Sequence, residues 1–158
     1  MKIDEAASEF LASRRFAVTG VSRNPEGHGG NSVYTRLKER GLDVVPVNPN
    51  AESIEGQPCY PDLASIPGGV DAVVIGTAAD HALGTMREVV DLGITKVWMH
   101  RAFGPGSVSP EASELGRAGG VLVIDGGCPL MFGATADGAH KVMCAILKLT
   151  GAVPRTVS

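Results

Sequence analysis

The residues best suited to bind a ligand follow the first predicted strand, residues 16–20 (FAVTG), which is apolar and ends on a glycine. A helix is expected after the next loop, and the free N–H groups and positive dipole of a helix start favour an anion. Arg23 supplies a forked donor that matches phosphate, and Ser22 and Ser32 supply hydroxyl groups. We therefore predict a phosphate-binding loop; an ordinary glycine-rich turn with a solvated Arg23 is the alternative. The residues assigned to the loop are Gly20, Val21, Ser22, Arg23 and Asn24.

Two further loops are expected beside the first one. Residues 43–47 (DVVPV) predict a strand that leads into Asn48 and Pro49, and residues 70–75 predict a strand that leads into Gly76 and Thr77. In doubly wound sheets, ligands bind beyond the carboxyl ends of the strands, where the strand order reverses. We expect Asn48 and Pro49 to flank a ribose or adenine, and the small Gly76-Thr77 loop to line the crevice. Plain turns are the alternative for both pairs.

The dinucleotide fingerprint GxGxxG is absent. A second glycine should follow Gly20 closely, and Ser22 stands there instead. The acidic residue expected at the end of the second strand, which would bind ribose hydroxyls, is replaced by neutral Asn48. A neutral residue tolerates a phosphorylated ribose, so the pattern weighs against NAD and is compatible with coenzyme A (CoA) or NADP.

One cysteine could take part in chemistry. Cys128 lies on a glycine-rich loop after the last predicted strand, where a pKa lowered by a nearby His or Arg would make it a nucleophile or a partner for a ligand thiol. A small buried thiol before Pro129 is the alternative. No spacing typical of a zinc site occurs. Side chains that could contact phosphate or exchange protons, or lie on the surface, are His28, His81, His100, Arg101, His140 and Lys141.

The elements that position these residues alternate between strands and helices. Strands are expected at residues 16–20, 43–47, 70–75, 96–99 and 121–125. Helices are expected at 4–12, from a cap at Asn31 or Ser32 to Gly41, for one turn at 63–66, at 80–92, at 110–118 after Ser109, and at 138–150 after Asp137. Val142, Met143, Ile146 and Leu149 form one stripe of the last helix. The alternation predicts a doubly wound parallel sheet in a three-layer, Rossmann-like α/β/α fold.

Composition supports one globular domain over residues 1–158, with an N-terminal helix (1–14) and a C-terminal helical extension (129–158). Hydrophobic residues make up 44% of the chain, and the formal net charge of −3 disfavours a nucleic-acid partner. Three cysteines without a CxxC pair are typical of a reduced, cytoplasmic protein. We see no signal peptide and no apolar run long enough to span a membrane. A homo-oligomer or a protein partner stays open.

At several of these positions the chain resembles the CoA-binding domain family, which includes the N-terminal domain of the succinyl-CoA synthetase α subunit. The resemblance runs from about residue 15 to 128 and rests on residues 20–25 (GVSRNP), 45–49 (VPVNP), 60–67 (YPDLASIP), 70–75 and 97–99. It implies a Rossmann fold and CoA binding by stand-alone bacterial proteins. By position, residues 20–24 would contact the phosphates. The family commonly has Asp-Arg-Cys after the last strand, whereas this chain has Asp125-Gly126-Gly127-Cys128.

The main hypothesis is a non-catalytic module that binds or senses CoA or acyl-CoA. An NAD(P)-binding oxidoreductase or redox sensor is the second hypothesis, and the missing fingerprint weighs against it. A Cys128-dependent acyl or thiol transferase is the third.

Overall fold

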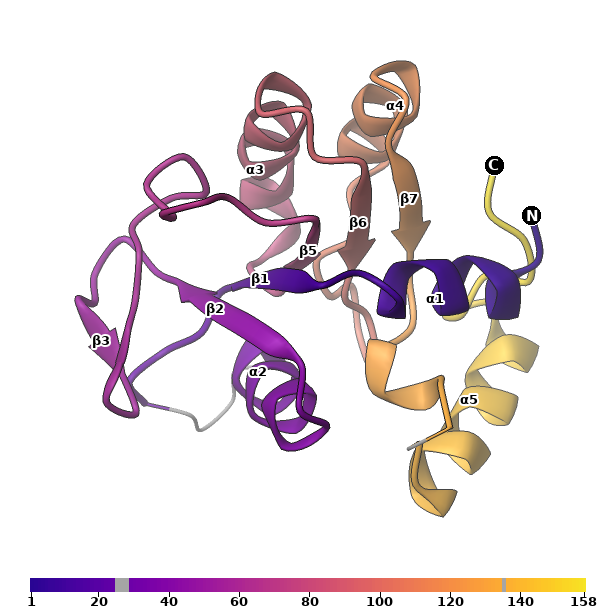
Figure 1. Ribbon diagram of the computed structural model, residues 1–158. Helices are drawn as coiled ribbons and strands as arrows, with labels where there is room; N and C mark the ends of the chain where they lie inside the picture. The colour runs from indigo at the N-terminus through magenta and orange to yellow at the C-terminus, as the bar shows by residue number, and fades with distance from the viewer. Residues whose placement is uncertain (25–28, 135) are drawn as a thin grey trace.

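The structure is a computed structural model that describes residues 1–24, 29–134 and 136–158. Strands and helices alternate along the chain (Figure 1). In chain order they are α1 (Ile3–Leu11), β1 (Arg15–Thr19), α2 (Gly29–Glu39), β2 (Asp43–Val47), β3 (Ser53–Ile54), β4 (Gln57–Pro58), β5 (Ala72–Ile75), α3 (Ala79–Asp91), β6 (Lys96–Met99), α4 (Pro110–Ala118), β7 (Leu122–Asp125), the 3₁₀ turn η1 (Pro129–Met131) and α5 (Gly138–Thr150).

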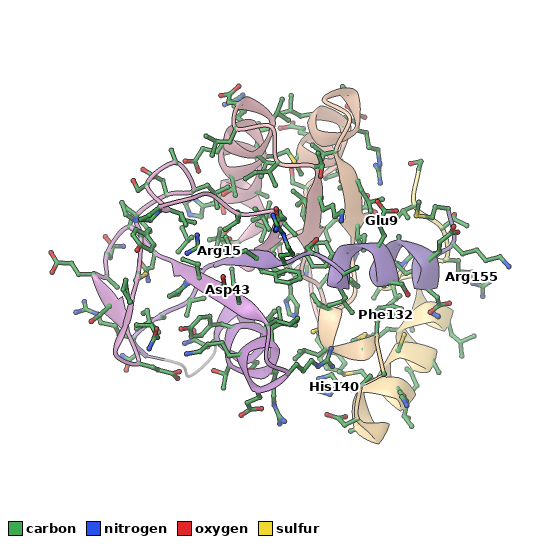
Figure 2. All side chains as sticks on the ribbon, in the orientation of Figure 1. Glu9, Arg15, Asp43, Phe132, His140 and Arg155 are labelled. Carbon is green, nitrogen blue, oxygen red and sulfur yellow. The ribbon has the colours of Figure 1, made fainter. Side chains whose placement is uncertain are left out.

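The central sheet is parallel and has the strand order β2-β1-β5-β6-β7. The chain moves from β1 to β2 on one side and then returns to β5 on the other side, so the strand order reverses between β1 and β5. Arg15 and Asp43 face each other at the amino ends of β1 and β2, where Arg15 Nε lies 3.2 Å from Asp43 Oδ2 (Figure 2). The parallel α/β architecture predicted from the sequence is confirmed.

Helices cover both faces of the sheet. α3 and α4 lie on one side, and α1, α2 and α5 pack on the other (Figure 1). Successive residues of a strand pack against opposite helical layers. Phe16 and Val18 of β1 pack toward α1 and α2, whereas Ala17 packs in the cluster of α3 and α4. This alternation on strands that are buried on both faces explains their near-continuous apolar runs.

Proline is tolerated in β2 because β2 is the outermost strand of the sheet. Outside it, the chain returns at Tyr60, which forms a bridge with Val47. Tyr60 N donates to Pro46 O (3.2 Å), and Asn48 N donates to Tyr60 O (2.9 Å). These bonds fix the segment after β4 beside the end of β2.

The C-terminal residues complete one layer of the core. Val153 and Val157 are buried in the same cluster as α1, and the N-terminal ammonium group of Met1 donates to Val157 O at 3.0 Å. Trp98 Nε1 donates to Gly126 O at 2.9 Å, and the Trp98 ring lies 5.4 Å from that of Phe132, between η1 and α5 (Figure 2). The segment after β7 therefore packs into the domain rather than projecting from it.

Two local predictions are wrong, and a third leaves open which side of a helix faces the domain. α2 already includes Gly29, so Asn31 and Ser32 lie inside the helix instead of capping it. Residues 63–66 form turns, because Ile66 N bonds to Leu63 O without continuing into a helix. The predicted stripe of α5 exists, but Val142, Ile146 and Leu149 face outward, and Cys144 and Leu147 are the buried residues. The capping side chains of Ser109 and Asp137 are as predicted.

Candidate functional site

A cavity of about 850 Å³ opens at the carboxyl ends of β1, β2 and β5. This is the place where the strand order reverses, and the volume lies within the range of small-molecule sites. The walls come from four segments: the β1 loop, the β2 loop with residues 61–62, the β5 loop, and the first turns of α3. The lining residues are Thr19, Gly20, Ser22, Arg23, Val47, Asn48, Pro49, Asn50, Pro61, Asp62, Gly76, Thr77, Ala78, His81, Gly84, Thr85 and Glu88.

The β1 loop is held by a buried side chain of α2. Asn31 Oδ1 accepts from Ser22 N (2.9 Å), and Asn31 Nδ2 donates to Ser22 O (2.7 Å). Ser22 Oγ in turn accepts from Asn24 N (3.1 Å). Since these bonds use the backbone N–H groups of Ser22 and Asn24, the hydroxyl hydrogen is the donor that Ser22 can offer to a ligand.

Three glycines bring the ends of β1, β5 and α2 into contact. A Cβ on Gly20 would lie 2.7 Å from the carbonyl of Gly76, and a Cβ on Gly76 would lie 2.6 Å from Thr19 O. A Cβ on Gly30 would lie 2.9 Å from Gly20 O. The chain thus achieves close helix-to-strand approach with glycines at a spacing different from GxGxxG. Sequence reasoning missed Gly30, although a glycine pair at a helix start could have signalled it.

The β2 loop is tied to the β1 loop. Asn48 Nδ2 donates to Val21 O (2.8 Å), and Asn48 Oδ1 accepts from Asn50 N (2.8 Å). Asn48 therefore positions two walls of the cavity in addition to lining it. An Asp or Glu at this position could not form the bond to the β1 loop, because a carboxylate cannot donate to the Val21 carbonyl.

The charges are distributed unevenly around the cavity. Arg23 is the only Lys or Arg among the described lining residues, and its Nη2 reaches Asn50 O at 3.3 Å, across the opening between the β1 and β2 loops. Asp62 and Glu88 lie in the wall formed by α3 and residues 61–62, where they accept bonds from the backbone N–H groups of Ser65 and Leu63. An anionic group is therefore favoured at Arg23 rather than at the wall of α3.

One buried polar atom in the wall has no partner within the described part of the chain. Thr77 Oγ1 is inaccessible to water and forms no hydrogen bond. A buried hydroxyl without a partner costs free energy, on the order of 1–3 kcal/mol. Rotation of the Thr77 side chain toward the cavity would let this hydroxyl donate to an acceptor of a bound ligand.

The structure brings most of the predicted binding residues together. Seven of them line the cavity: Gly20, Ser22, Arg23, Asn48, Pro49, Gly76 and Thr77. Val21 is fully buried and contributes its carbonyl to the loop, Asn24 lies on the exposed side of the loop, and Ser32 is exposed on α2. None of these three contributes to the lining. His28 lies outside the described residues.

Cys128 lies in a different part of the molecule. It is 4% exposed in the layer of α1 and α5, and burial raises its pKa to about 11 despite the nearby Arg40. Of the two readings of Cys128, the structure agrees with the small buried thiol and not with a nucleophile of lowered pKa, because desolvation outweighs the attraction of the guanidinium group. Gly126 and Gly127 pack against the backbone of Ala152 and the side chain of Val153, so the C-terminal segment occupies the space beside them.

His100 is a candidate that the structure places near the β1 loop. A Cβ on Gly29, the first residue of α2, would lie 3.0 Å from the His100 ring. Burial lowers the pKa of His100, which favours a neutral imidazole. His81 lines the cavity, whereas His140 bonds to Asp137 at the start of α5 (2.8 Å; Figure 2).

No group of three potential metal ligands occurs among residues 1–24, 29–134 and 136–158. No described helix is long and apolar enough to cross a membrane.

The sheet order, the two helical layers and the cavity at the strand reversal define a Rossmann-like α/β domain. The family model described as "CoA binding domain" matches residues 14–134. The chain belongs to this CoA-binding domain family.

Relatives include both large enzymes and small proteins. The chain is 39% identical over 88 residues to the ADP-forming acetate–CoA ligase II of Archaeoglobus fulgidus, and the match spans 54% of this chain and 13% of the ligase. It is 26% identical over 112 residues to the uncharacterized protein YneT of Bacillus subtilis, covering 71% of this chain and 79% of YneT.

Solved structures agree on the fold. A hypothetical protein from Pyrococcus horikoshii OT3 superposes with a TM-score of 0.73 at 28% identity, covering 80% of this chain and 86% of that one. The dinucleotide-forming acetyl-coenzyme A synthetase 1 of Ca. Korarchaeum cryptofilum superposes with a TM-score of 0.60 at 26% identity, covering 72% of this chain and 26% of the synthetase.

Proposed function

We propose that the protein binds CoA or acyl-CoA in the cavity at the carboxyl ends of β1, β2 and β5. The single observation that carries the proposal is this cavity, built from the β1, β2 and β5 loops in a chain of the CoA-binding domain family. The pyrophosphate would lie against the β1 loop, with Arg23 and the Ser22 hydroxyl as donors. The Thr77 hydroxyl would donate to an acceptor of the ligand at the β5 loop.

The adenosine part would lie between Asn48-Pro49 and the wall of α3. Asn48 is neutral, so a phosphate on the ribose meets no carboxylate at the end of β2. Asp62 and Glu88, farther along the wall, disfavour phosphate there and keep the phosphates at the Arg23 end. The pyrophosphate of CoA then matches the Arg23 end of the cavity, and the ribose phosphate lies at the neutral end of β2.

The proposed role is binding or sensing without a reaction at this site. The described lining contains no cysteine, and Cys128 is a buried thiol with a raised pKa in another layer of the molecule. The large ligase relatives carry this domain as a small part of a longer chain. A module that holds CoA for a partner or reports its level is the function that this arrangement favours.

Isothermal titration tests the proposal with four ligands: CoA, dephospho-CoA, NADPH and NAD. We expect CoA to bind at stoichiometry one, and dephospho-CoA and NAD to bind more weakly. Binding of NADPH without binding of CoA would replace the proposal with the oxidoreductase hypothesis. No heat with any ligand, confirmed by native mass spectrometry of the freshly purified protein, would overturn it.

A further inference from the structure

The outward face of α5 is apolar. Phe103 (77%), Val142 (62%), Ile146 (55%) and Leu149 (79%) are four of the exposed large hydrophobic side chains of the described chain. The same helix buries Cys144 and Leu147 on its inner side. Its exposed residues are Gly138, Ala139, Lys141, Val142, Ala145, Ile146, Leu149 and Thr150, which include one charged side chain. A helix that is apolar on both sides is normally buried.

The exposed apolar residues of α5 form a regular seam. Ala139, Val142, Ile146 and Leu149 follow one another at intervals of three, four and three residues, which is the a/d spacing of helices that pack against each other. Phe103, from the loop after β6, borders a groove of about 450 Å³ along α5. α5 lies at the edge of the molecule, and no described element covers its outer face (Figure 1).

We propose that this face binds a second copy of the chain, with the two α5 helices packed antiparallel across a two-fold axis. Antiparallel pairing centred near residue 144 places Val142 opposite Ile146 of the partner subunit. It also places small Ala139 opposite Leu149 of the partner subunit, so at both ends of the helix pair a large leucine side chain packs against a small alanine. The seam is thus complementary to itself, as an interface with two-fold symmetry requires.

The helix dipoles favour the antiparallel direction. Antiparallel packing places the positive start of one α5 beside the negative end of α5 of the partner subunit. Lys148 faces the domain, where its ammonium group contacts Asp4 at 3.3 Å and lies over the Phe132 ring, so the seam itself holds no charged side chain.

The buried area indicates a weak dimer. The four apolar side chains expose on the order of 300–400 Å² per protomer, by the usual areas of such residues. A standard interface buries about 800 Å² per partner, so the flanking small residues and Lys141 must contribute the rest. We therefore expect dissociation in the micromolar range and a concentration-dependent mass.

Sedimentation velocity of the full chain, from about 1 to about 300 µM, measures this association. We expect the mass to rise from 16.3 kDa toward twice that value. Ile146→Lys places a charge in the seam and should raise the dissociation constant by more than about tenfold. The matched control is Leu92→Lys, since Leu92 is 47% exposed at the end of α3 and should leave dimerisation unchanged.

A wild-type chain that stays monomeric at the highest concentration would overturn the proposal, and so would an Ile146→Lys variant that dimerises like the wild type. Far-UV circular dichroism verifies that each variant is folded, which is expected because the substituted residues are exposed.

Cysteine cross-linking tests the direction of packing. Ala145→Cys lies near the two-fold axis, so two copies should form a disulfide under mild oxidation. Leu149→Cys alone should not, because residue 149 lies opposite 139 of the partner subunit, whereas Ala139→Cys combined with Leu149→Cys should. Efficient cross-linking of Leu149→Cys alone would contradict the antiparallel arrangement.

Discussion

The side-chain amide of Asn31 forms two hydrogen bonds with the backbone of Ser22, one to its N–H at 2.9 Å and one from Nδ2 to its carbonyl oxygen at 2.7 Å. Ser22 belongs to the loop proposed to contact the ligand phosphates, and Asn31 is a buried residue of α2. The conformation of the loop is therefore set by the helix whose start it faces.

Replacing Asn31 by Ala should weaken both folding and CoA binding. Loss of two buried hydrogen bonds leaves the Ser22 N–H and C=O unpaired, so we expect a free energy of unfolding lower by about 1–3 kcal/mol. Urea unfolding measures the stability, and isothermal titration measures the affinity. Ser32→Ala is the control on the same helix, because Ser32 is exposed and does not line the cavity. A loss of CoA affinity in this control would show that Ser32 contributes to binding after all.

Arg23→Gln should reduce CoA affinity roughly tenfold to a hundredfold, since a charge-assisted hydrogen bond to phosphate is lost. The variant should also show a smaller loss of affinity when salt is added, because one screened charge pair has been removed. Titrations at low and high salt measure both effects. Arg36→Gln, an exposed arginine of α2 outside the cavity lining, should behave as wild type. Equal salt dependence of the Arg23→Gln variant and the wild type would argue against a phosphate contact.

Gly76→Ala should destabilise the protein by about 1–3 kcal/mol, as overpacking does in tight interiors. The added methyl group would lie 2.6 Å from Thr19 O and 3.0 Å from Gly30 Cα, both of them backbone atoms that cannot move independently. Gly84→Ala in α3 is the contrast, because nothing lies within 4 Å of its Cβ. Alanine in a helix interior should stabilise by about 0.5–1 kcal/mol. Urea unfolding compares the free energies of unfolding of the two variants. Similar values would show that the backbone around Gly76 can move away from Thr19 and Gly30 to accommodate the methyl group.

Alkaline pH should destabilise the fold through Cys128. Burial raises the pKa of this thiol from 9.0 to about 11, so the folded state keeps the proton that the unfolded chain releases. The contribution to stability is present below pH 9 and is lost as the pH rises toward about 11. The urea midpoint of the wild type should therefore fall more steeply over this interval than that of Cys128→Ala. Parallel curves would mean that the thiol is accessible to solvent, and rapid reaction with a thiol reagent at neutral pH would show it directly.

The sheet could be predicted from the sequence because its strands are short apolar runs that end on glycine or polar residues. Residues 43–47 and 96–99 form strands with the predicted bounds. Ser109 caps α4 as predicted, since the signals for a helix start are local. The cavity at the strand reversal follows from topology alone, and seven of the ten predicted binding residues line it.

What the sequence did not reveal depends on contacts between distant segments. The role of Asn31 requires that the β1 loop fold back onto α2, and the close packing of Gly30 requires three chain segments to meet. The stripe of α5 has the period of a buried face, but Cys144 and Leu147 supply the inner contacts, and periodicity does not tell which side faces the domain. The raised pKa of Cys128 follows from burial by the C-terminal segment, which no local pattern shows.

The two ends of the described chain lie side by side, with a bridge between Lys2 and Thr156 and a bond from Ile3 N to Arg155 O (Figure 1). A short peptide linker could join them, and the chain could then be opened at the exposed turn at Glu55 and Gly56 between β3 and β4. Such a circular permutant would keep every neighbour in the five-stranded sheet, because the new ends would lie in the separate β3–β4 hairpin. Fluorescent labels could then be attached outside the central sheet.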